Sequence, residues 1–265
     1  MGYIFDNAVE SLSTQRLDSI AMLYDERTTG FLERIGAHAG WHCLEVGSGH
    51  GSIVSWLASR VGDDGSVLAT DIDPRFLVSA RSQNVEIRRH DISVDPLPSN
   101  RFDLIHARLV LIHVAKPWRA VERLVAALKP GGWLLIEDFD PSLVRRDLSC
   151  ANANDAALCN KVFAAMRVLM MDRGLDVEFA RSLYPNLLAM GLVDVAMEGH
   201  LAVRPGGSIG ARLDQANLAQ ISEEAIARKI LTHEEVERIA AALESDEFAV
   251  LSPVMLSAWG RKPRC

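Results

Sequence analysis

Three glycines alternate with other residues in a seven-residue stretch of sequence EVGSGHG, at residues 45–51. The stretch follows a short apolar run at 41–47 and precedes a helical pattern at 51–60. Glycine permits a tight turn and lets a ligand approach the backbone closely. The following helix presents free N–H groups and a partial positive charge. The stretch therefore predicts a binding site for an anionic group such as a carboxylate or a phosphate.

Two classes of ligand use such a turn. A dinucleotide site usually has the pattern G-x-G-x-x-G/A, followed by an acidic residue about 20 positions later. Here Gly51 comes one residue earlier than that pattern requires, and Ser52 occupies the expected place. Glu45 also stands two residues before the first glycine. These departures disfavour a dinucleotide, but the turn and Asp71 keep an NAD-dependent oxidoreductase as an alternative hypothesis.

Candidate groups for proton transfer or substrate orientation lie just beyond two apolar runs. His113 follows the run at 102–107, and a histidine can remove a proton near neutral pH. The alternative for His113 is a packed or capping side chain. Asp138 and Asp140 end the run at 133–139, where they could orient a substrate hydroxyl or amine, or hold their loop. His106, inside an apolar run, is interpreted as structural.

The elements that must position these residues alternate regularly. Helical patterns at 51–60, around 74–81 and at 116–128 separate five predicted strands, at 41–47, 66–71, 85–89, 102–107 and 133–139. Such alternation is typical of an α/β protein with a doubly wound, mostly parallel sheet. Two further predicted strands, at 193–203 and within 248–259, bring the sheet to seven strands.

Helical patterns also flank this core. We expect one domain over residues 1–265, with an N-terminal helical segment at 1–36 and a ligand-binding core at 37–140. Two stretches of helical pattern, 141–190 with helices at 151–172 and 176–190, and 208–245, look like additions to the core. We expect these added helices to form a cap over the active site.

The core resembles the class I methyltransferases that depend on S-adenosylmethionine (SAM), particularly the UbiE-like branch that acts on small molecules. The resemblance depends on five motifs in order: EVGSGHG at 45–51, ATDIDP at 69–74, RHDI at 89–92, FDLIHAR at 102–108 and LKPGGW at 128–133. It implies a Rossmann-like fold and SAM as cofactor. It covers about 45–138 and is looser elsewhere.

The resemblance also implies roles by position. Gly47, Gly49 and Gly51 would let the backbone pass under the methionine and ribose portions, and Ala107 and Arg108 would lie beside the methionine portion. Glu45 is also counted among the cofactor-binding residues. Asp71 would accept hydrogen bonds from the ribose hydroxyls, beside Ile72 against the adenine. Asp91 would accept from the adenine amino group, next to Ile92. Tyr3 and Arg16 belong to an N-terminal segment that often folds over SAM in this family, where they could reach its carboxylate.

The function expected from these motifs is methyl transfer from SAM to an oxygen, nitrogen or carbon atom of a small organic metabolite. A protein of this fold could also bind SAM while catalysing another reaction, such as a cyclisation, because fold does not fix function. His113 and Asp138 are the candidate catalytic residues, although a sulfonium is a good leaving group and needs a base only when the nucleophile must lose a proton.

Composition narrows the partners. The formal net charge is -7 and no basic face is evident, so nucleic acid is not expected as a substrate. The four cysteines have no zinc-site spacing, and we expect no metal. No run has the length of a membrane span, and the N-terminus lacks the apolar region of a signal peptide. We therefore expect a cytoplasmic protein, whose N-terminal helices could support a homodimer.

Overall fold

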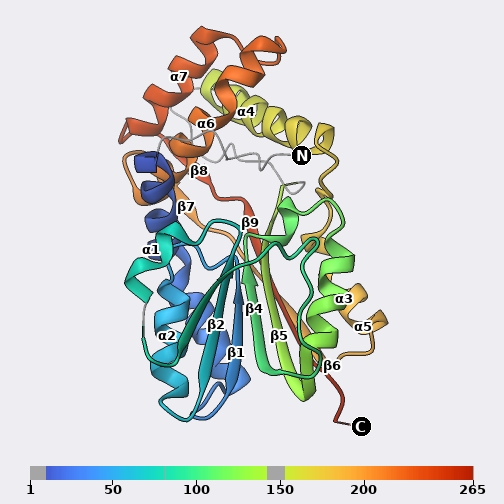
Figure 1. The fold of residues 1–265 in the computed structure, drawn as a ribbon. Helices are drawn as coiled ribbons and strands as arrows, with labels where there is room; N and C mark the ends of the chain where they lie inside the picture. The colour runs from blue at the N-terminus through green and yellow to red at the C-terminus, as the bar shows by residue number, and fades with distance from the viewer. Residues whose placement is uncertain (1–9, 81, 142–152, 265) are drawn as a thin grey trace. The chain divides into compact units, whose positions relative to one another are not determined.

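A seven-stranded sheet dominates the computed structural model, which describes residues 10–80, 82–141 and 153–264 (Figure 1). The strand order is β3-β2-β1-β4-β5-β9-β6. The strands are β1 (His42–Val46), β2 (Ser66–Asp71), β3 (Val85–Arg89), β4 (Phe102–Arg108), β5 (Leu128–Asp140), β6 (Val193–His200) and β9 (Val254–Arg261). From β1 the chain adds β2 and β3 on one side and then β4 and β5 on the other, as in a doubly wound sheet. The predicted fold class is therefore confirmed.

Helices connect and flank these strands. In chain order, the helices next to the sheet strands are α1 (Glu10–Ile35), α2 (Ser52–Val61), the 3-10 helices η1 (Pro74–Ala80) and η2 (Leu111–His113), α3 (Pro117–Ala127), the 3-10 helix η3 (Ala180–Ser182) and α5 (Leu183–Ala189). The remaining helices are α4 (Ala153–Asp172), α6 (Ile209–Ala227) and α7 (His233–Glu244), with the short strands β7 (Val203–Pro205) and β8 (Ala249–Leu251).

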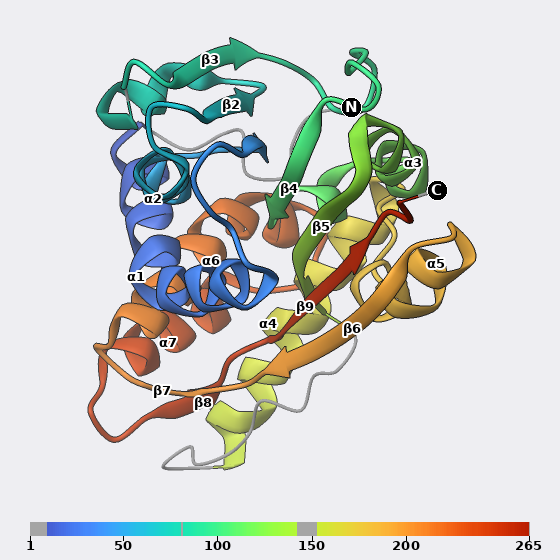
Figure 2. The ribbon, with the colours of Figure 1, turned by 90° about the horizontal axis from the view of Figure 1, so that it is seen from below.

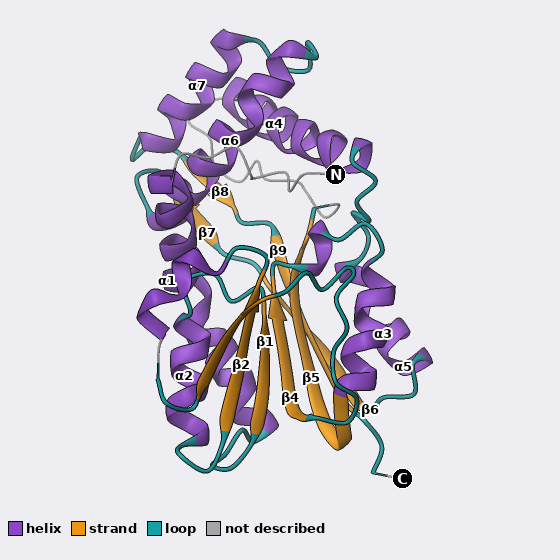
Figure 3. Ribbon diagram, in the orientation of Figure 1, coloured by secondary structure: helices purple, strands orange, loops and turns teal. Residues whose placement is uncertain are grey.

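The chain divides into two compact units. The sheet unit contains residues 24–139, 179–199 and 256–265, and the helical unit contains the described residues within 1–23, 140–178 and 200–255. In the helical unit α6 packs against α7, and β7 pairs antiparallel with β8 (Figure 3). This unit holds most of the two stretches that the sequence analysis expected to be additions to the core.

The register of the sheet brings the motif residues to one edge. β1 pairs parallel with β2 and β4, β2 with β3, and β4 with β5. In this register Glu45 is paired with His106, and Arg108 with Glu137. Parallel strands end together at their carboxyl ends, which is where open α/β sheets bind ligands. The motifs at the ends of β1, β2, β3 and β4 therefore converge on the same edge, whereas residues 128–133 form the opposite, amino-terminal end of β5.

Two apolar layers hold the sheet between helices. On one face Leu32 of α1 and Leu57 of α2 pack with Cys43 and Leu104 of the sheet. On the other face α3 and α5 contribute Leu124, Val121, Leu183 and Leu187, which pack on Leu44 and Ile105 of the sheet. Figure 2 shows these helices on opposite sides of the strands. Because helices cover both faces of the sheet, β1, β2 and β4 are almost continuously buried.

Two predicted helices differ from the structure. The stretch 74–81 forms the 3-10 helix η1 over its described residues, and the stretch 176–190 becomes α-helical only at Leu183. Asp176 accepts a hydrogen bond from the Glu178 backbone N–H at 3.0 Å, which forms a local turn in place of a first helical turn. None of the described helices is both long and apolar enough to cross a bilayer.

Candidate active site at the carboxyl ends of the strands

The glycine turn between β1 and α2 has the backbone that only glycine adopts readily. Gly47, Gly49 and Gly51 have φ angles of 66°, 52° and 84°. Gly51 is the N-cap residue of α2, and no side chain in the described part of the chain caps this helix. No acidic residue lies in its first turn. The N–H groups and the positive end of the helix dipole at this turn are therefore suited to an anionic ligand group.

The turn is tightly packed from beneath. A Cβ atom on Gly47 would overlap Cγ2 of Val110, and one on Gly51 would lie 2.5 Å from Cβ of Ala80. Leu109, beside Val110, has a φ angle of 56°, which is an uncommon and strained conformation for a leucine. The loop after β4 and the glycine turn thus support each other in close contact.

Asp71, at the carboxyl end of β2, is bound to the same turn. Its Oδ2 accepts a hydrogen bond from the Gly49 N–H at 3.0 Å, and its Oδ1 accepts from the Asp73 N–H at 2.9 Å. Burial raises the pKa of Asp71, and the two backbone donors partly offset that effect. Each carboxylate oxygen can accept more than one hydrogen bond, so both remain able to bind a diol. Ile72, which follows Asp71, is 60% exposed, so that most of its apolar side chain contacts water.

Asp91, the second predicted carboxylate, lies in a tight turn after β3. Its Oδ1 accepts hydrogen bonds from the backbone N–H and the hydroxyl of Ser93, at 2.8 and 2.6 Å, and its own N–H donates to Asp95. Ile92 is buried, and its carbonyl accepts from Arg123 at 3.0 Å. One carboxylate oxygen of Asp91 thus holds the turn, which keeps the residue at the strand end.

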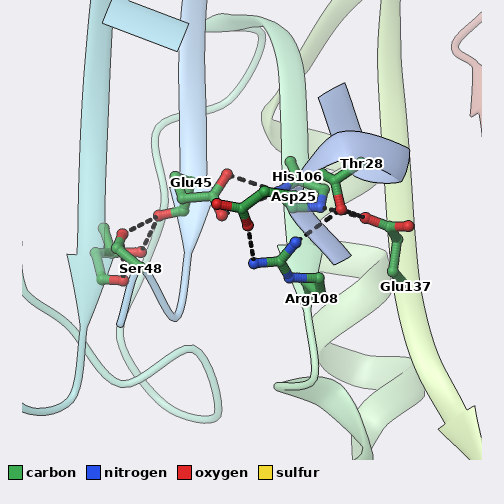
Figure 4. Close-up of polar contacts among 8 residues, drawn as sticks. Asp25, Thr28, Glu45, Ser48, His106, Arg108 and Glu137 are labelled. Carbon is green, nitrogen blue, oxygen red and sulfur yellow. Dashed lines mark hydrogen bonds and ion pairs between the residues drawn. The ribbon is translucent and has the colours of Figure 1, made fainter. Parts of the chain in front are cut away.

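A buried acid–histidine–acid cluster crosses three strands at this edge (Figure 4). His106 Nδ1 lies 2.7 Å from Oε2 of Glu45, and His106 Nε2 lies 3.1 Å from Oε2 of Glu137. Burial alone would lower the pKa of His106, but the two carboxylates outweigh it and raise the pKa to about 9. The pKa of Glu137 is lowered, because the imidazole and neighbouring donors outweigh its burial. His106, which the sequence analysis interpreted as structural, is paired with both acids.

Helix α1 joins this cluster through Arg108. The guanidinium of Arg108 donates to Asp25 at 2.7 Å and to Thr28 Oγ1 at 2.8 Å. Thr28 in turn donates to Glu137 at 2.6 Å, and Ser257 of β9 donates to the other oxygen of Glu137 at 2.6 Å. Figure 4 shows Arg108 and Thr28 pointing toward each other between β4 and α1. Arg108 is therefore largely buried at the end of β4, where Ala107 is fully buried.

Asp138, a candidate catalytic residue, is fully buried near the end of β5. Its Oδ2 accepts from the Ile112 N–H at 3.2 Å, whereas its Oδ1 has no hydrogen-bond partner among the described residues. Burial raises the pKa of Asp138 well above its ordinary value, and the charge of Glu137 adds to the shift. His113 ends η2, directly after Ile112, and is half-buried. The structure thus brings both candidate catalytic residues to the β4–β5 end of the edge.

The two N-terminal candidates have different outcomes. Arg16 is buried in α1 within the helical unit, and its Nε donates to Asn217 of α6 at 3.1 Å. Tyr3 lies outside the described residues. Among the described residues no group of three or more histidine, cysteine, aspartate or glutamate side chains has a metal-binding arrangement.

Three residues of this edge were not found by sequence reasoning: Thr28, Glu137 and Ser257. Each carries a polar side chain that is buried in the structure. The available signal was polarity inside apolar runs, since Glu137 directly follows the run Leu134, Leu135 and Ile136. Buried polar side chains are hydrogen-bonded as a rule, so such a residue predicts a partner but not which one.

Comparisons with known proteins agree with this geometry. Residues 44–136 match the family described as "Methyltransferase domain". The methyltransferase Str2 of Strobilurus tenacellus is 38% identical over 102 residues, which are 37% of this chain and 35% of that protein. The ubiquinone/menaquinone biosynthesis C-methyltransferase UbiE of Shewanella sediminis is 31% identical over 116 residues, which are 41% of this chain and 46% of that protein. The matches thus span about a third to a half of these relatives.

Solved structures show the same fold over most of the chain. A phosphoethanolamine N-methyltransferase of Haemonchus contortus, in complex with phosphomonomethylethanolamine and S-adenosylhomocysteine, has a TM-score of 0.59 at 14% identity. That match covers 98% of this chain and 60% of the other. The YcgJ protein of Bacillus subtilis has a TM-score of 0.54 at 13% identity, with 90% of this chain and 99% of the other covered.

Proposed function

We propose that the protein transfers a methyl group from SAM to an oxygen, nitrogen or carbon atom of a small organic metabolite, because residues 44–136 match the family described as "Methyltransferase domain" and the chain is similar to UbiE. The observation that carries the proposal is the hydrogen bond between the Gly49 N–H and Asp71 Oδ2. It joins a turn suited to an amino-acid carboxylate with a carboxylate suited to a sugar diol. The two parts of one ligand, the methionine and ribose portions of SAM, need that pairing.

The residues present fit this cofactor. The uncapped first turn of α2 would take the methionine carboxylate, with Gly47, Gly49 and Gly51 beneath it. Asp71 would bind the ribose, and the exposed side chain of Ile72 would lose its contact with water against the adenine. Asp91 and Ile92 would contact the adenine from the end of β3. Glu45, Ala107, Arg108, Arg16 and Tyr3 keep the roles that the family resemblance gives them, as part of the proposal.

When bound, SAM would supply a methyl group on a positively charged sulfur, which is a good leaving group. The task left to the protein is to align the acceptor atom and to exclude water. Asp138 suits the acceptor side, because a buried carboxyl with one unpartnered oxygen can orient a hydroxyl or an amine. Its raised pKa makes it a better proton acceptor when ionised. We assign Asp138 and His113 to the acceptor on this basis.

The cap, the location and the assembly state belong to the same proposal. The added helices would cover an organic substrate, the protein would act in the cytoplasm, and its N-terminal helices would support a homodimer. The net charge of -7 supports a small-molecule partner rather than a nucleic acid.

The first experiment measures thermal unfolding with S-adenosylhomocysteine for the wild type, Asp71→Asn and Asp73→Asn. Asp73 is the matched control, because it lies two residues away and its carboxylate binds Arg75 at the surface. A hundredfold excess of ligand over its dissociation constant should stabilise the wild type and the control by about 2.7 kcal/mol. Asp71→Asn should lose most of that shift.

A wild type whose melting temperature ignores millimolar S-adenosylhomocysteine would contradict the cofactor assignment. Binding of NADH in a fluorescence titration would instead favour the oxidoreductase. Transfer of a labelled methyl group from SAM into a pool of small metabolites tests the reaction itself. Cofactor binding without any transfer would favour a SAM-binding protein with another reaction.

A further inference from the structure

The charge state of His106 is fixed by its two partners. A neutral imidazole has one ring nitrogen that donates a hydrogen bond and one that accepts. Both ring nitrogens of His106 face carboxylates, at 2.7 and 3.1 Å, and carboxylates only accept. When both acids are ionised, only the protonated imidazole can donate to both. The geometry thus fits an imidazolium at His106, fully buried between Glu45 and Glu137.

Among the residues that the structure describes, no other cation lies between those two acids. Glu45 comes from β1 and Glu137 from β5, and both are buried. The next cation, Arg108, is paired with Asp25 of α1 and reaches Glu137 only through the hydroxyl of Thr28. If His106 lost its proton, two desolvated carboxylates would face one neutral ring. Burying an uncompensated charge is costly, so the strands that carry these acids would shift.

Glu45 transmits such a shift to the glycine turn. Its backbone carbonyl accepts from Thr70 Oγ1 at 3.0 Å and from Ser48 Oγ at 3.2 Å, and Val46 alone separates it from Gly47. The turn cannot shift toward Val110, because that side chain fills the space beneath Gly47. The other end of the turn, at Gly49, is bonded to Asp71. The side chain of Glu45 and the backbone of the turn therefore move together.

We propose that His106 is a positioning residue, whose positive charge holds Glu45 against Glu137 and so keeps the glycine turn in the conformation that binds SAM. His106 acts through Glu45 and does not touch the ligand. The affinity for the cofactor is then linked to the protonation of a buried histidine, and α1 is part of the same network through Thr28 and Arg108. This inference rests on the proposed function, since it assigns the turn to SAM.

The test measures the dissociation constant of S-adenosylhomocysteine by calorimetry from pH 7 to pH 10. Three variants accompany the wild type: His106→Gln, Glu137→Gln and Asp103→Asn. Glu137→Gln keeps the shape of the cluster but removes one of the charges that keep His106 protonated. Asp103→Asn is the matched control. Asp103 lies on the same strand as His106, but its ion pair is with Lys129 of β5, away from the cluster. The ligand's own amino group titrates identically in all four proteins.

We expect the affinity of the wild type to fall as His106 loses its proton, near the value of about 9 given by its surroundings. In Glu137→Gln the fall should begin at a lower pH. His106→Gln should bind about tenfold more weakly at pH 7, as when one charge-assisted hydrogen bond is lost. Its pH profile should keep only the contribution of the ligand. Asp103→Asn should match the wild type throughout.

Identical pH profiles for the wild type and Glu137→Gln would overturn the inference, as would wild-type affinity in His106→Gln. The ¹⁵N shifts of the His106 ring supply a reading without ligand: a neutral ring at pH 7 overturns the inference even if His106→Gln fails to fold. If the wild type binds no S-adenosylhomocysteine while its His106 ring is charged at pH 7, the proposed function is contradicted instead.

Discussion

His106 and Glu45 occupy paired positions on adjacent parallel strands, and Nδ1 of the histidine lies 2.7 Å from Oε2 of the glutamate. The acid belongs to the motif that forms the glycine turn, and the histidine belongs to the strand that ends at Ala107 and Arg108. Two motifs that are 61 residues apart in the sequence are thus joined by one buried ion pair. The stability of the protein and the shape of its turn should both depend on that pair.

The first prediction is that the protein is less stable at alkaline pH. The pKa of His106 is raised from 6.5 to about 9, against the effect of burial, by Glu45 and Glu137. A group with a raised pKa in the folded state stabilises fully below its unfolded pKa, and that contribution is lost as the pH rises through the folded value. The free energy of unfolding should therefore fall between pH 6.5 and about 9, by on the order of 3 kcal/mol.

Urea unfolding of the wild type and His106→Gln across that range measures this effect. Asp138 also has a raised pKa and contributes a slope of the same sign to both proteins. The difference between the two proteins isolates His106. Parallel curves would mean that the histidine is neutral in the folded state.

A second prediction concerns Thr28, whose hydroxyl donates to Glu137 and accepts from Arg108. Thr28→Val keeps the shape but removes both bonds, and should lower the free energy of unfolding by about 1–3 kcal/mol, the cost of a buried acceptor left unmet. Thr29→Val is the control, because that hydroxyl only bonds within its own helix, to the Glu26 carbonyl. Equal effects of both substitutions in urea unfolding would show that Glu137 does not depend on Thr28.

The sequence was sufficient for the sheet and for the turn. Short apolar runs that alternate with helical patterns marked the strands, and the spacing of the motifs placed Gly49 and Asp71 at one edge. It was insufficient for the partners of buried polar residues. His106 interrupts one apolar run and Glu137 directly follows another, and only the register of β1, β4 and β5 brings them together. Tertiary register is set by packing over the whole sheet, which no local pattern contains.

The third prediction compares two glycines with similar backbone angles. Gly47 and Gly40 have φ angles of 66° and 84°, so alanine is strained at both. At Gly47 the added Cβ would also overlap Val110, whereas at Gly40 no atom of the described residues lies within 4 Å of it. Gly47→Ala should therefore cost about 1–3 kcal/mol more than Gly40→Ala, as for overpacked sites. It should also weaken binding of S-adenosylhomocysteine, while Gly40→Ala leaves binding unchanged. Similar losses from both would remove the argument from close packing.

A fourth prediction separates the proposed acceptor site from the cofactor site. Asp138→Asn should reduce the rate of methyl transfer by about 10²–10⁴-fold, the usual contribution of a general acid–base group. Its affinity for S-adenosylhomocysteine should be unchanged, because Asp138 contacts the backbone after β4 and not the glycine turn. Rates measured at saturating SAM over pH 6 to 9 give the comparison. An undiminished rate would assign the carboxyl to holding η2 alone.

The last prediction concerns the helical unit, where Arg204 of β7 and Asp214 of α6 form a buried ion pair at 2.7 Å. The stem of Arg204 packs against Gly210, where a Cβ atom would lie 2.6 Å from its Cδ. Arg204→Met keeps the apolar stem but removes the positive charge beside the buried carboxylate of Asp214. It should lower the free energy of unfolding by about 3–5 kcal/mol. Lys161→Met, which removes the exposed pair with Glu235, should cost at most about 1 kcal/mol. Adding Asp214→Leu to Arg204→Met should recover much of the loss, because replacing both charges leaves no buried ion. Urea unfolding of the wild type and these three variants distinguishes this from a simple packing role, for which the double variant would be less stable than Arg204→Met alone.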